Sequence, residues 1–467
     1  MSKDKKTKIP GRLMRTLKAG RLTGALSGSY LGGKLIDRFR SEDSRVKAGL
    51  ERHARNAKRV VETMSELRGP LMKIGQLLST HGEFLPGEFV DVLGSLQSDV
   101  PPMPYETIRE QVFAELGQWP EEAFVEFEPE AFAAASMGQV HRAVVEVEED
   151  GEARRVQVAV KIQYPGADAM VEADLKNMEG SIKLIKTVAK DMVGQSRLDF
   201  TPVYREVAEH LRQETDYCRE AYNAQLMHAV LSDVEGLRVP RVYNAWSSLR
   251  MVTYEFIEGE KLSDYLDRDD LTMDDRKRLT KQLALGFWSQ IFGNGIMHAD
   301  PHPGNYLITP EGELALLDFG CVKIFSEAWA EGFIQLLLAR IHRDDAAERR
   351  AILALEMVDD PDNDDDVEDI RRIGNYFSVG VTQDEEVNLA DYDYAARGRE
   401  LMKHFLTHRR LPKSHQDFIF LTRVSLGLYE YFSRLNAPVN YHRIAMPIIA
   451  DGWTGRKVPI PDYYLPE

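Results

Sequence analysis

The sequence predicts an α+β fold of two lobes: a small lobe built on an antiparallel sheet and a large helical lobe, with extra helices at the N-terminus. Apolar residues recur at helical spacing up to about residue 118, alternate at strand spacing between residues 140 and 162, and return to helical spacing from about residue 326. The length of 467 residues allows two or three domains of about 150 residues each.

The composition is typical of a protein kept in a reducing compartment. Its two cysteines, Cys218 and Cys321, are too few for a disulfide framework. No stretch reaches the roughly 18 consecutive apolar residues of a membrane-spanning helix, and the N-terminus lacks the apolar core of a secretory signal. We therefore expect a cytoplasmic protein.

Charge is divided unevenly along the chain, whose net charge is −16. Residues 1–59 contain 17 Lys and Arg against 5 Asp and Glu, and the remainder contains 42 against 70. Such an acidic body argues against a nucleic-acid partner, since affinity for duplexes comes mainly from basic side chains. The glycine-rich basic segment 1–43 is interpreted either as a flexible tail or as a peripheral contact with an anionic membrane surface.

Helices are expected to precede the sheet. Ser44–Leu67 has helical spacing, Pro70 suits the first turn of a second helix, and Tyr105–Leu116 follows a proline-rich linker. Residues 44–118 are therefore predicted to form an N-terminal helical extension.

The small lobe is predicted to occupy residues 119–259. Valines recur in two β-type runs, at 140–147 and 156–162, and the Asp150-Gly151 step between them is a hairpin signal. The remaining elements expected in this lobe are helical stretches at 167–190 and 203–231 and a buried strand at Arg250–Ile257.

Residues 260–467 are predicted to form the helical lobe. A helix at about 275–293 precedes a polar loop and the short strand Leu314–Leu317, and the chain from about residue 326 is mostly helical. Asp359–Asp369 is expected to be a solvated acidic loop, because Val367 stands where a calcium-binding EF-hand loop needs glycine.

Three segments carry residues suited to phosphoryl transfer. Lys161 ends an alternating strand, although on its own it is more simply interpreted as a surface lysine on an edge strand. Asp300 and Asn305 have the spacing at which phosphoryl-transfer enzymes place a carboxylate near the nucleophile and an amide on a metal ion. Asp318 ends an apolar strand, where a carboxylate is costly unless it is paired or binds a cation such as Mg²⁺. The order Lys, Asp-x4-Asn, Asp-Phe-Gly predicts a protein-kinase-like fold.

An alanine-rich turn stands where a glycine-rich phosphate-binding loop would be expected. Alanine is less permissive than glycine at positive φ and keeps the backbone farther from phosphates, so the segment can be an ordinary turn, but its position suits a nucleotide lid. The candidate cofactor-binding residues are Ala133, Ala134, Ala135, Ser136, Gly138 and Gln139 of this turn, together with Lys161 and Glu255.

Two further motifs give a closer resemblance. Lys73-Ile-Gly75-Gln76 matches a K-x-G-Q motif, and Glu214-Thr-Asp216 matches an E-x-D motif. With the alanine-rich turn, they make residues 60–325 resemble the AarF/UbiB atypical kinase family, which includes bacterial UbiB proteins and mitochondrial relatives in coenzyme Q biosynthesis. The chain departs from members that end in hydrophobic membrane helices, because residues 437–467 are polar.

The resemblance implies a role for each matching residue of the kinase-type motifs. Lys161 would hold the α- and β-phosphates of ATP, with Glu220 as its partner. Asp300 would be the catalytic-loop aspartate, and Asn305 and Asp318 would bind Mg²⁺.

The family-specific motifs imply a cover over the cleft. Lys73 and Gln76 would fold over it and contact Glu214 and Asp216. These two carboxylates are expected on one long helix with Glu220, where Asp216 and Glu220 share a face because they lie one turn apart. A helix in the place of a protein substrate argues against ordinary protein kinase activity.

Together these residues predict an atypical kinase-like ATPase or phosphotransferase that binds Mg²⁺-ATP and acts on, or regulates, a small-molecule or lipid pathway. The resemblance implies isoprenoid quinone (ubiquinone) biosynthesis as that pathway. The alternatives are a nucleotide-sensing pseudokinase, a conventional Ser/Thr protein kinase, and a non-enzymatic lipid carrier or membrane adaptor that uses residues 1–43. A homodimer is also left open.

Overall fold

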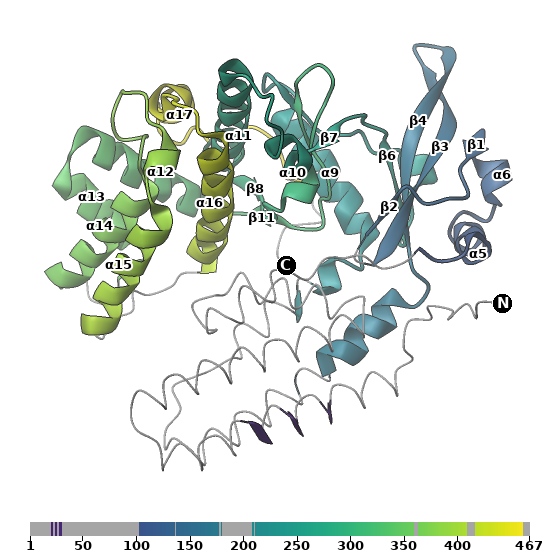
Figure 1. Ribbon diagram of the computed structural model, residues 1–467, viewed down its shortest axis with the longest axis horizontal. Coiled ribbons are helices and arrows are strands. Elements are labelled where there is room, and N and C mark those ends of the chain that lie inside the picture. The colour runs from purple at the N-terminus through teal and green to yellow at the C-terminus, as the bar shows by residue number, and fades with distance from the viewer. Residues whose placement is uncertain are drawn as a thin grey trace. The chain divides into compact units, whose positions relative to one another are not determined.

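The structure is a computed structural model (Figure 1). The residues that it describes are 20–21, 24–25, 28–29, 102–135, 137–176, 179, 208–209, 211–358, 363–408 and 416–460. The helices expected at 44–67 and from Pro70, most of the basic segment 1–43, and the motif residues Lys73 and Gln76 lie outside these ranges. The chain forms two compact units: unit 1 contains residues up to Glu220 and Tyr243–Phe256, and unit 2 contains Ala221–Val242 and the chain from Ile257.

Unit 1 is built on a five-stranded sheet in which every pairing is antiparallel, as predicted for the small lobe. The strands follow the order β1-β3-β4-β6, and β2 pairs with β3 beside β1. The elements are α5 (Tyr105–Leu116), α6 (Pro120–Ala123), β1 (Glu126–Phe127), β2 (Ala133–Ala134), β3 (Gly138–Glu149), β4 (Glu152–Gln163) and β6 (Met251–Glu255).

The long β3–β4 hairpin turns where the sequence predicts. Glu149 faces Glu152 at the end of the ladder, and Asp150 and Gly151 between them have φ of 56° and 79°. Positive φ at both central residues is typical of the type I′ turn, whose twist matches that of the flanking strands. Turn chemistry therefore sets the register of the hairpin, and with it the face of the sheet on which each β4 side chain lies.

Helix α5 covers one face of this sheet. Its buried residues Ile108 and Val112 pack with alternate residues of the two long strands, including Val145, Val158 and Val160. The helix has the bounds expected from its apolar spacing and ends at Gly117, whose φ of 71° is typical of a helix C-cap.

The helix expected at 203–231 is interrupted, and this corrects the prediction of one long helix. Residues 211–213 are helical, residues 214–216 form a turn, and α9 (Tyr217–Leu231) begins anew. The Asp216 carboxylate accepts a hydrogen bond from the backbone N–H of Arg219 at 3.0 Å, as a helix N-cap does. Glu214 and Asp216 therefore precede the helix that carries Glu220 and do not share a face of it.

Unit 2 is mostly helical and contains two small sheets. The larger sheet has the order β5-β10-β9-β7, and β8 pairs with β11. The strands are β5 (Leu237–Arg238), β7 (Glu260–Lys261), β8 (Ile296–His298), β9 (Tyr306–Ile308), β10 (Leu314–Leu316) and β11 (Val322–Ile324). The helices up to β11 are α9 from Ala221 onward, since its first turn up to Glu220 belongs to unit 1, α10 (Leu262–Leu266) and α11 (Met273–Asn294).

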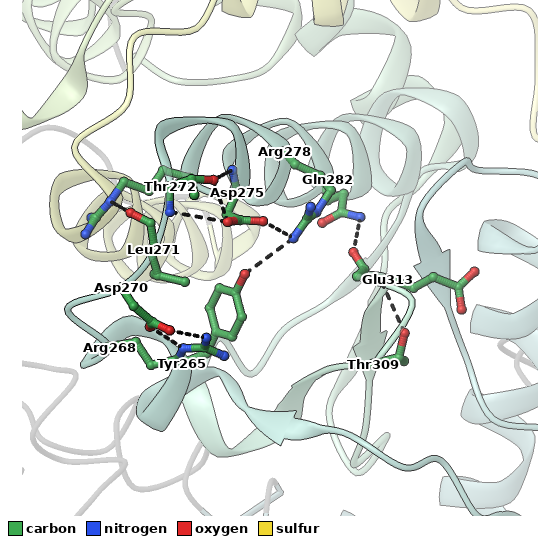
Figure 2. Close-up of polar contacts among 12 residues, drawn as sticks. Tyr265, Arg268, Asp270, Leu271, Thr272, Asp275, Arg278, Gln282, Thr309 and Glu313 are labelled. Carbon is green, nitrogen blue, oxygen red and sulfur yellow. Dashed lines mark hydrogen bonds and ion pairs between the residues drawn. The ribbon is translucent and has the colours of Figure 1, made fainter.

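Helix α11 is held at its first turn and along one side (Figure 2). Thr272 and Asp275 form a reciprocal capping box, with both side-chain-to-backbone distances at 3.2 Å. Farther along, the Gln282 amide donates to the carbonyl oxygen of Gly312, in the turn between β9 and β10, at 2.8 Å. The helix ends at Gly295 and leads directly into β8, so it fixes where the polar loop after β8 begins.

The chain after β11 is mostly helical, as predicted. Its helices are α12 (Glu327–His342), α13 (Asp345–Ala354), α14 (Asp364–Phe377), α15 (Tyr394–His408), α16 (Gln416–Leu435) and α17 (Tyr441–Ile449). The acidic loop expected at Asp359–Asp369 is partly wrong, because Asn363 caps α14 and the aspartates from Asp364 lie in its first turn, where negative charge is favourable. No helix within the described part of the chain is long and apolar enough to cross a membrane.

Candidate active site

A buried ion pair in unit 1 brings together Lys161 and Glu220. The Nζ atom of Lys161, on β4, lies 2.7 Å and 2.9 Å from the two carboxylate oxygens of Glu220, in the first turn of α9. The side chains are 12% and 3% exposed. Tyr254 on β6 donates its hydroxyl to the same carboxylate at 3.0 Å, and the Tyr217 ring centre lies 5.2 Å from Nζ. The expected pairing of Lys161 with Glu220 is therefore present, and the hydroxyl of Tyr254 also holds the Glu220 carboxylate in place.

The alanine-rich segment forms β2, which pairs with β3, and β3 in turn pairs with β4, the strand that carries Lys161. Ala133 and Ala134 pair with Val140 and Gln139, and the N–H of Ala135 donates to the carbonyl of Gly138 at 2.9 Å. Ser136 lies outside the described residues. This pairing is compatible both with an ordinary turn and with a nucleotide lid, so the lid stays a prediction.

Gly138 is required by the packing of the hairpin on β4. A Cβ atom at this position would lie 2.3 Å from the carbonyl oxygen of Ile162 and 2.8 Å from the hydroxyl of Tyr217. The backbones can approach this closely only because glycine has no side chain.

Gln139 has a different environment from the one expected of a nucleotide-binding side chain. It is 1% exposed; its amide oxygen accepts from the N–H of Met103 at 2.6 Å and its amide nitrogen contacts Nε2 of His141 at 2.9 Å. The other ring nitrogen of His141 bonds the carbonyl of Glu128 at 2.8 Å, and burial lowers the pKa of this histidine. The Gln139 side chain therefore ties the chain before α5 to the sheet.

The remaining predicted site residues of unit 1 that the structure describes lie on different elements. Glu214 lies in the turn before α9, Asp216 caps that helix, and Glu255 ends β6 opposite Val158. The contact expected between these two carboxylates of the E-x-D motif and Lys73 and Gln76 stays a prediction, because the latter two residues are outside the described ranges.

In unit 2, the loop after β8 holds Asp300 and Asn305 together. The Asn305 amide nitrogen donates to a carboxylate oxygen of Asp300 at 3.0 Å, across the short 3₁₀ turn Pro303–Asn305. The backbone carbonyl of Asn305 accepts from the N–H of Leu317 at 2.7 Å, which ties the loop to the end of β10. Because its amide nitrogen is engaged by Asp300, Asn305 has its amide oxygen to offer to a cation.

Asp318 lies at the end of this strand in a conformation that few residues adopt. Its φ is 56°, its carboxylate accepts from the N–H of Gly320 at 3.2 Å, and its carbonyl accepts from Nε2 of His298 at 2.8 Å. The next carbonyl, of the buried Phe319, accepts from the amide of Asn223 on α9 at 2.7 Å. Left-handed backbone at a non-glycine residue is costly, and these bonds on both sides hold it in place.

The donor set of unit 2 fits a magnesium ion that is also bound by phosphate. Within the described ranges, no three His, Cys, Asp or Glu side chains gather as a metal site. Mg²⁺ is usually held by one or two carboxylates together with phosphate oxygens and water. The Asp318 carboxylate and the Asn305 amide oxygen, hard oxygen donors from neighbouring segments, meet that requirement without a third protein ligand.

Two side chains that contact the residues on either side of Asp300 were not identified from the sequence. Arg423 and Tyr431 of α16 donate to the carbonyls of Ala299 and Pro301, which flank Asp300. Their separation of eight positions, with Gly427 midway, places all three on one face of a helix. That spacing is the signal that could have singled them out.

Comparison with known proteins places the chain in a family. The family model of the ABC1 atypical kinase-like domain matches residues 95–351, which is more than half of the chain. The chain belongs to the ABC1 atypical kinase-like family. This membership confirms the resemblance to the AarF/UbiB kinases. The matched range includes Lys161 and Glu220 of unit 1 and Asp300, Asn305 and Asp318 of unit 2.

Individual relatives of this ABC1 atypical kinase-like chain are moderately similar. It is 36% identical to the chloroplastic protein Activity of BC1 Complex Kinase 8 of Arabidopsis thaliana, over 62% of this chain and 37% of that protein. It is 32% identical to AarF domain-containing protein kinase 1 of Xenopus tropicalis, over 69% of this chain and 60% of that protein. The chain thus spans between about a third and three fifths of these two relatives' length.

A solved structure confirms the predicted α+β kinase-like fold. Rv3197 of Mycobacterium tuberculosis, solved in complex with erythromycin, is 26% identical and superposes with a TM-score of 0.60. The match covers 88% of this chain and 98% of that one.

Proposed function

We propose that this protein binds Mg²⁺-ATP and either hydrolyses it or transfers its terminal phosphoryl group. One observation carries the proposal: Lys161 and Glu220 form a buried, doubly hydrogen-bonded ion pair in a chain of the ABC1 atypical kinase-like family. Desolvation offsets much of the attraction between two buried charges, so stability alone gives little reason for such a pair. A strand lysine paired with a helix glutamate is the arrangement that kinases use to bind nucleotide phosphates.

Each residue has a role that its contacts support. Lys161 binds the α- and β-phosphates, and Glu220 orients the ammonium group, with Tyr254 keeping the carboxylate in place. Asp300, oriented by the Asn305 amide, positions the attacking hydroxyl or water and accepts its hydrogen bond.

The metal would be held by Asp318 and the amide oxygen of Asn305. A bound Mg²⁺ supplies charge neutralisation at the phosphate oxygens. The N–H of Gly320 orients the Asp318 carboxylate, and His298 holds the backbone carbonyl of the same residue, before nucleotide arrives. Such prior ordering is how positioning and electrostatics, rather than covalent chemistry, accelerate phosphoryl transfer.

The acceptor we propose is a small molecule or a component of a lipid pathway, with isoprenoid quinone (ubiquinone) biosynthesis as the process. The resemblance to the AarF/UbiB kinases supports this class of substrate. We place the protein in the cytoplasm, with the basic segment 1–43 as a peripheral contact with anionic membrane, and we leave a homodimer open.

Three alternatives predict different outcomes in the same assay. A nucleotide-sensing pseudokinase binds ATP without releasing ADP, and a conventional Ser/Thr protein kinase phosphorylates peptides far faster than it hydrolyses ATP. A non-enzymatic lipid carrier or membrane adaptor binds vesicles through residues 1–43 and has no need of nucleotide. The presence of Lys161, Glu220, Asp300, Asn305 and Asp318 together favours an enzyme over the pseudokinase and the adaptor.

The test is Mg²⁺-ATP binding by calorimetry and ADP release by the full-length protein, with and without anionic vesicles and quinone-precursor phenols. Asp318→Asn should abolish turnover and weaken the Mg²⁺ dependence of binding, and asparagine also tolerates the positive φ at this position. Asp384→Asn, which removes an exposed ion pair with Arg443, is the matched control and should leave both unchanged. A wild-type protein that takes up no Mg²⁺-ATP would refute the proposal.

A further inference from the structure

Helix α16 contacts the loop after β8 on both sides of Asp300. The Nη2 atom of Arg423 donates to the carbonyl of Ala299 at 2.6 Å, and the hydroxyl of Tyr431 donates to the carbonyl of Pro301. Between these two residues, Gly427 faces the Pro301 ring, where a Cβ atom would lie 2.8 Å from the ring. The three α16 residues are spaced by four and so form one face of the helix.

The same helix also holds the segment that follows Asp-Phe-Gly. Lys323 on β11 forms an ion pair of 2.7 Å with Asp417 in the first turn of α16. The Nη2 atom of Arg423 also lies 3.8 Å from the sulfur of Cys321, and the carbonyl of Cys321 accepts from the N–H of Ala299 at 2.9 Å. Both segments that carry the chemistry of unit 2 are therefore attached to one helix.

Helix α16 is itself fixed at its far end. Arg276, in the first turn of α11, donates to the carbonyls of Arg434 and Leu435 at 3.3 Å and 3.1 Å. These carbonyls at a helix C-terminus are otherwise left without a helical partner, and a cation there is favourable. Helix α11 therefore leads into β8 and also contacts the end of α16, and Figure 1 shows α11, α16, β8 and β11 as neighbours.

From this geometry we propose that Arg423, Gly427 and Tyr431 are positioning residues, which hold the carboxylate of Asp300 in its working orientation. The proposal rests on the function proposed above. It assigns part of the active-site geometry to a helix outside residues 95–351, the range that the family model matches.

The physical reason is backbone orientation. Fixing the carbonyl of Ala299 limits rotation of the peptide plane that precedes Asp300, and fixing the carbonyl of Pro301 limits rotation of the Pro301–His302 plane, one peptide farther along. The Asn305 amide fixes the carboxylate of Asp300 itself. Tyr306, at the start of β9, is buried: burial, followed by the charge of Asp300, raises the pKa of Tyr306. A misplacement of about 1 Å in a catalytic group can cost a hundredfold in rate.

The test compares two tyrosines of α16. Tyr431→Phe removes the bond to Pro301, and the control Tyr429→Phe removes a similar bond, since the Tyr429 hydroxyl donates to the carbonyl of Phe377 at 2.6 Å. Hydrogen exchange of the peptide containing residues 299–305 is measured without nucleotide, and Mg²⁺-ATP turnover and KM are measured on the same full-length proteins. Gly427→Ala, which should push Pro301 away, is a second and independent variant.

We expect Tyr431→Phe and Gly427→Ala to speed exchange of this peptide about tenfold, the factor that one lost hydrogen bond implies. Turnover should fall by a similar factor while KM for Mg²⁺-ATP changes less than twofold, and Tyr429→Phe should change neither. Unchanged exchange in both variants would overturn the proposal, as would faster exchange with unchanged turnover. If the wild type neither binds nor turns over Mg²⁺-ATP, the proposed function fails and the positioning role fails with it, while the exchange data still report separately whether α16 holds the loop.

Discussion

Replacing Lys161 by methionine should lower the free energy of unfolding by about 3–5 kcal/mol, because the Glu220 carboxylate would stay buried without this cation. At 2.7 Å and an effective dielectric constant of about 20, the attraction between the two charges is about 6 kcal/mol. Desolvation offsets part of this attraction, so we expect a net coupling energy of about 2–4 kcal/mol between the two side chains.

A double-mutant cycle measures that coupling directly. Lys161→Met, Glu220→Gln and the double variant are unfolded in urea and followed by far-UV circular dichroism, and the coupling is the departure from additivity. The control cycle uses Arg443 and Asp384, whose ion pair has the same 2.7 Å distance but side chains that are 73% and 50% exposed. Solvent screens the control pair, so its coupling should be much smaller. If the two cycles give the same coupling, the reasoning from burial is refuted.

Three further predictions concern packing and pH. Gly138→Ala should cost about 3 kcal/mol in urea unfolding, because the Cβ atom would meet the β4 backbone at 2.3 Å. Gly374→Ala should destabilise the protein by about 2 kcal/mol, because its Cβ atom would overlap the buried guanidinium of Arg340. As a control, Gly293→Ala on α11, where a Cβ atom would meet no other atom, should be neutral or stabilise by up to about 1 kcal/mol. Equal changes in stability for the two variants would contradict the packing argument. Burial lowers the pKa of His141 below 6.5, so the unfolded chain binds this proton more tightly than the folded chain. Stability should therefore fall as the pH drops from about 6.5 through the lowered pKa, and His141→Gln should lose less over the same range; a parallel loss in both proteins would show that His141 is not the cause.

Local signals in the sequence predicted much of the fold. The helix at Tyr105–Leu116 has the bounds expected from its apolar period, and the hairpin turns at Asp150-Gly151. Both depend on interactions between residues a few positions apart, namely i to i+4 contacts in a helix and backbone conformation in a two-residue turn. Such interactions are fully specified by a short stretch of sequence.

Local signals gave a wrong prediction at Asp216, a residue type that can either lie within a helix or cap the start of one. A single helix was expected over residues 203–231, but the Asp216 carboxylate bonds the N–H of Arg219 and starts a new helix there. Aspartate competes for backbone N–H groups in this way and is favoured at caps for that reason. For Gln139, only the fold reveals that its amide faces Met103 and His141.

The residue types and order of the motifs, from Lys161 through Asp300 and Asn305 to Asp318, were determined by the sequence alone, because chemistry depends on which side chains are present. Their geometry was decided by tertiary structure. Lys161 meets Glu220 across 59 positions and Arg423 meets Ala299 across 124. Contacts at such separations form only when whole strands and helices pack, and no periodicity within a short segment encodes them.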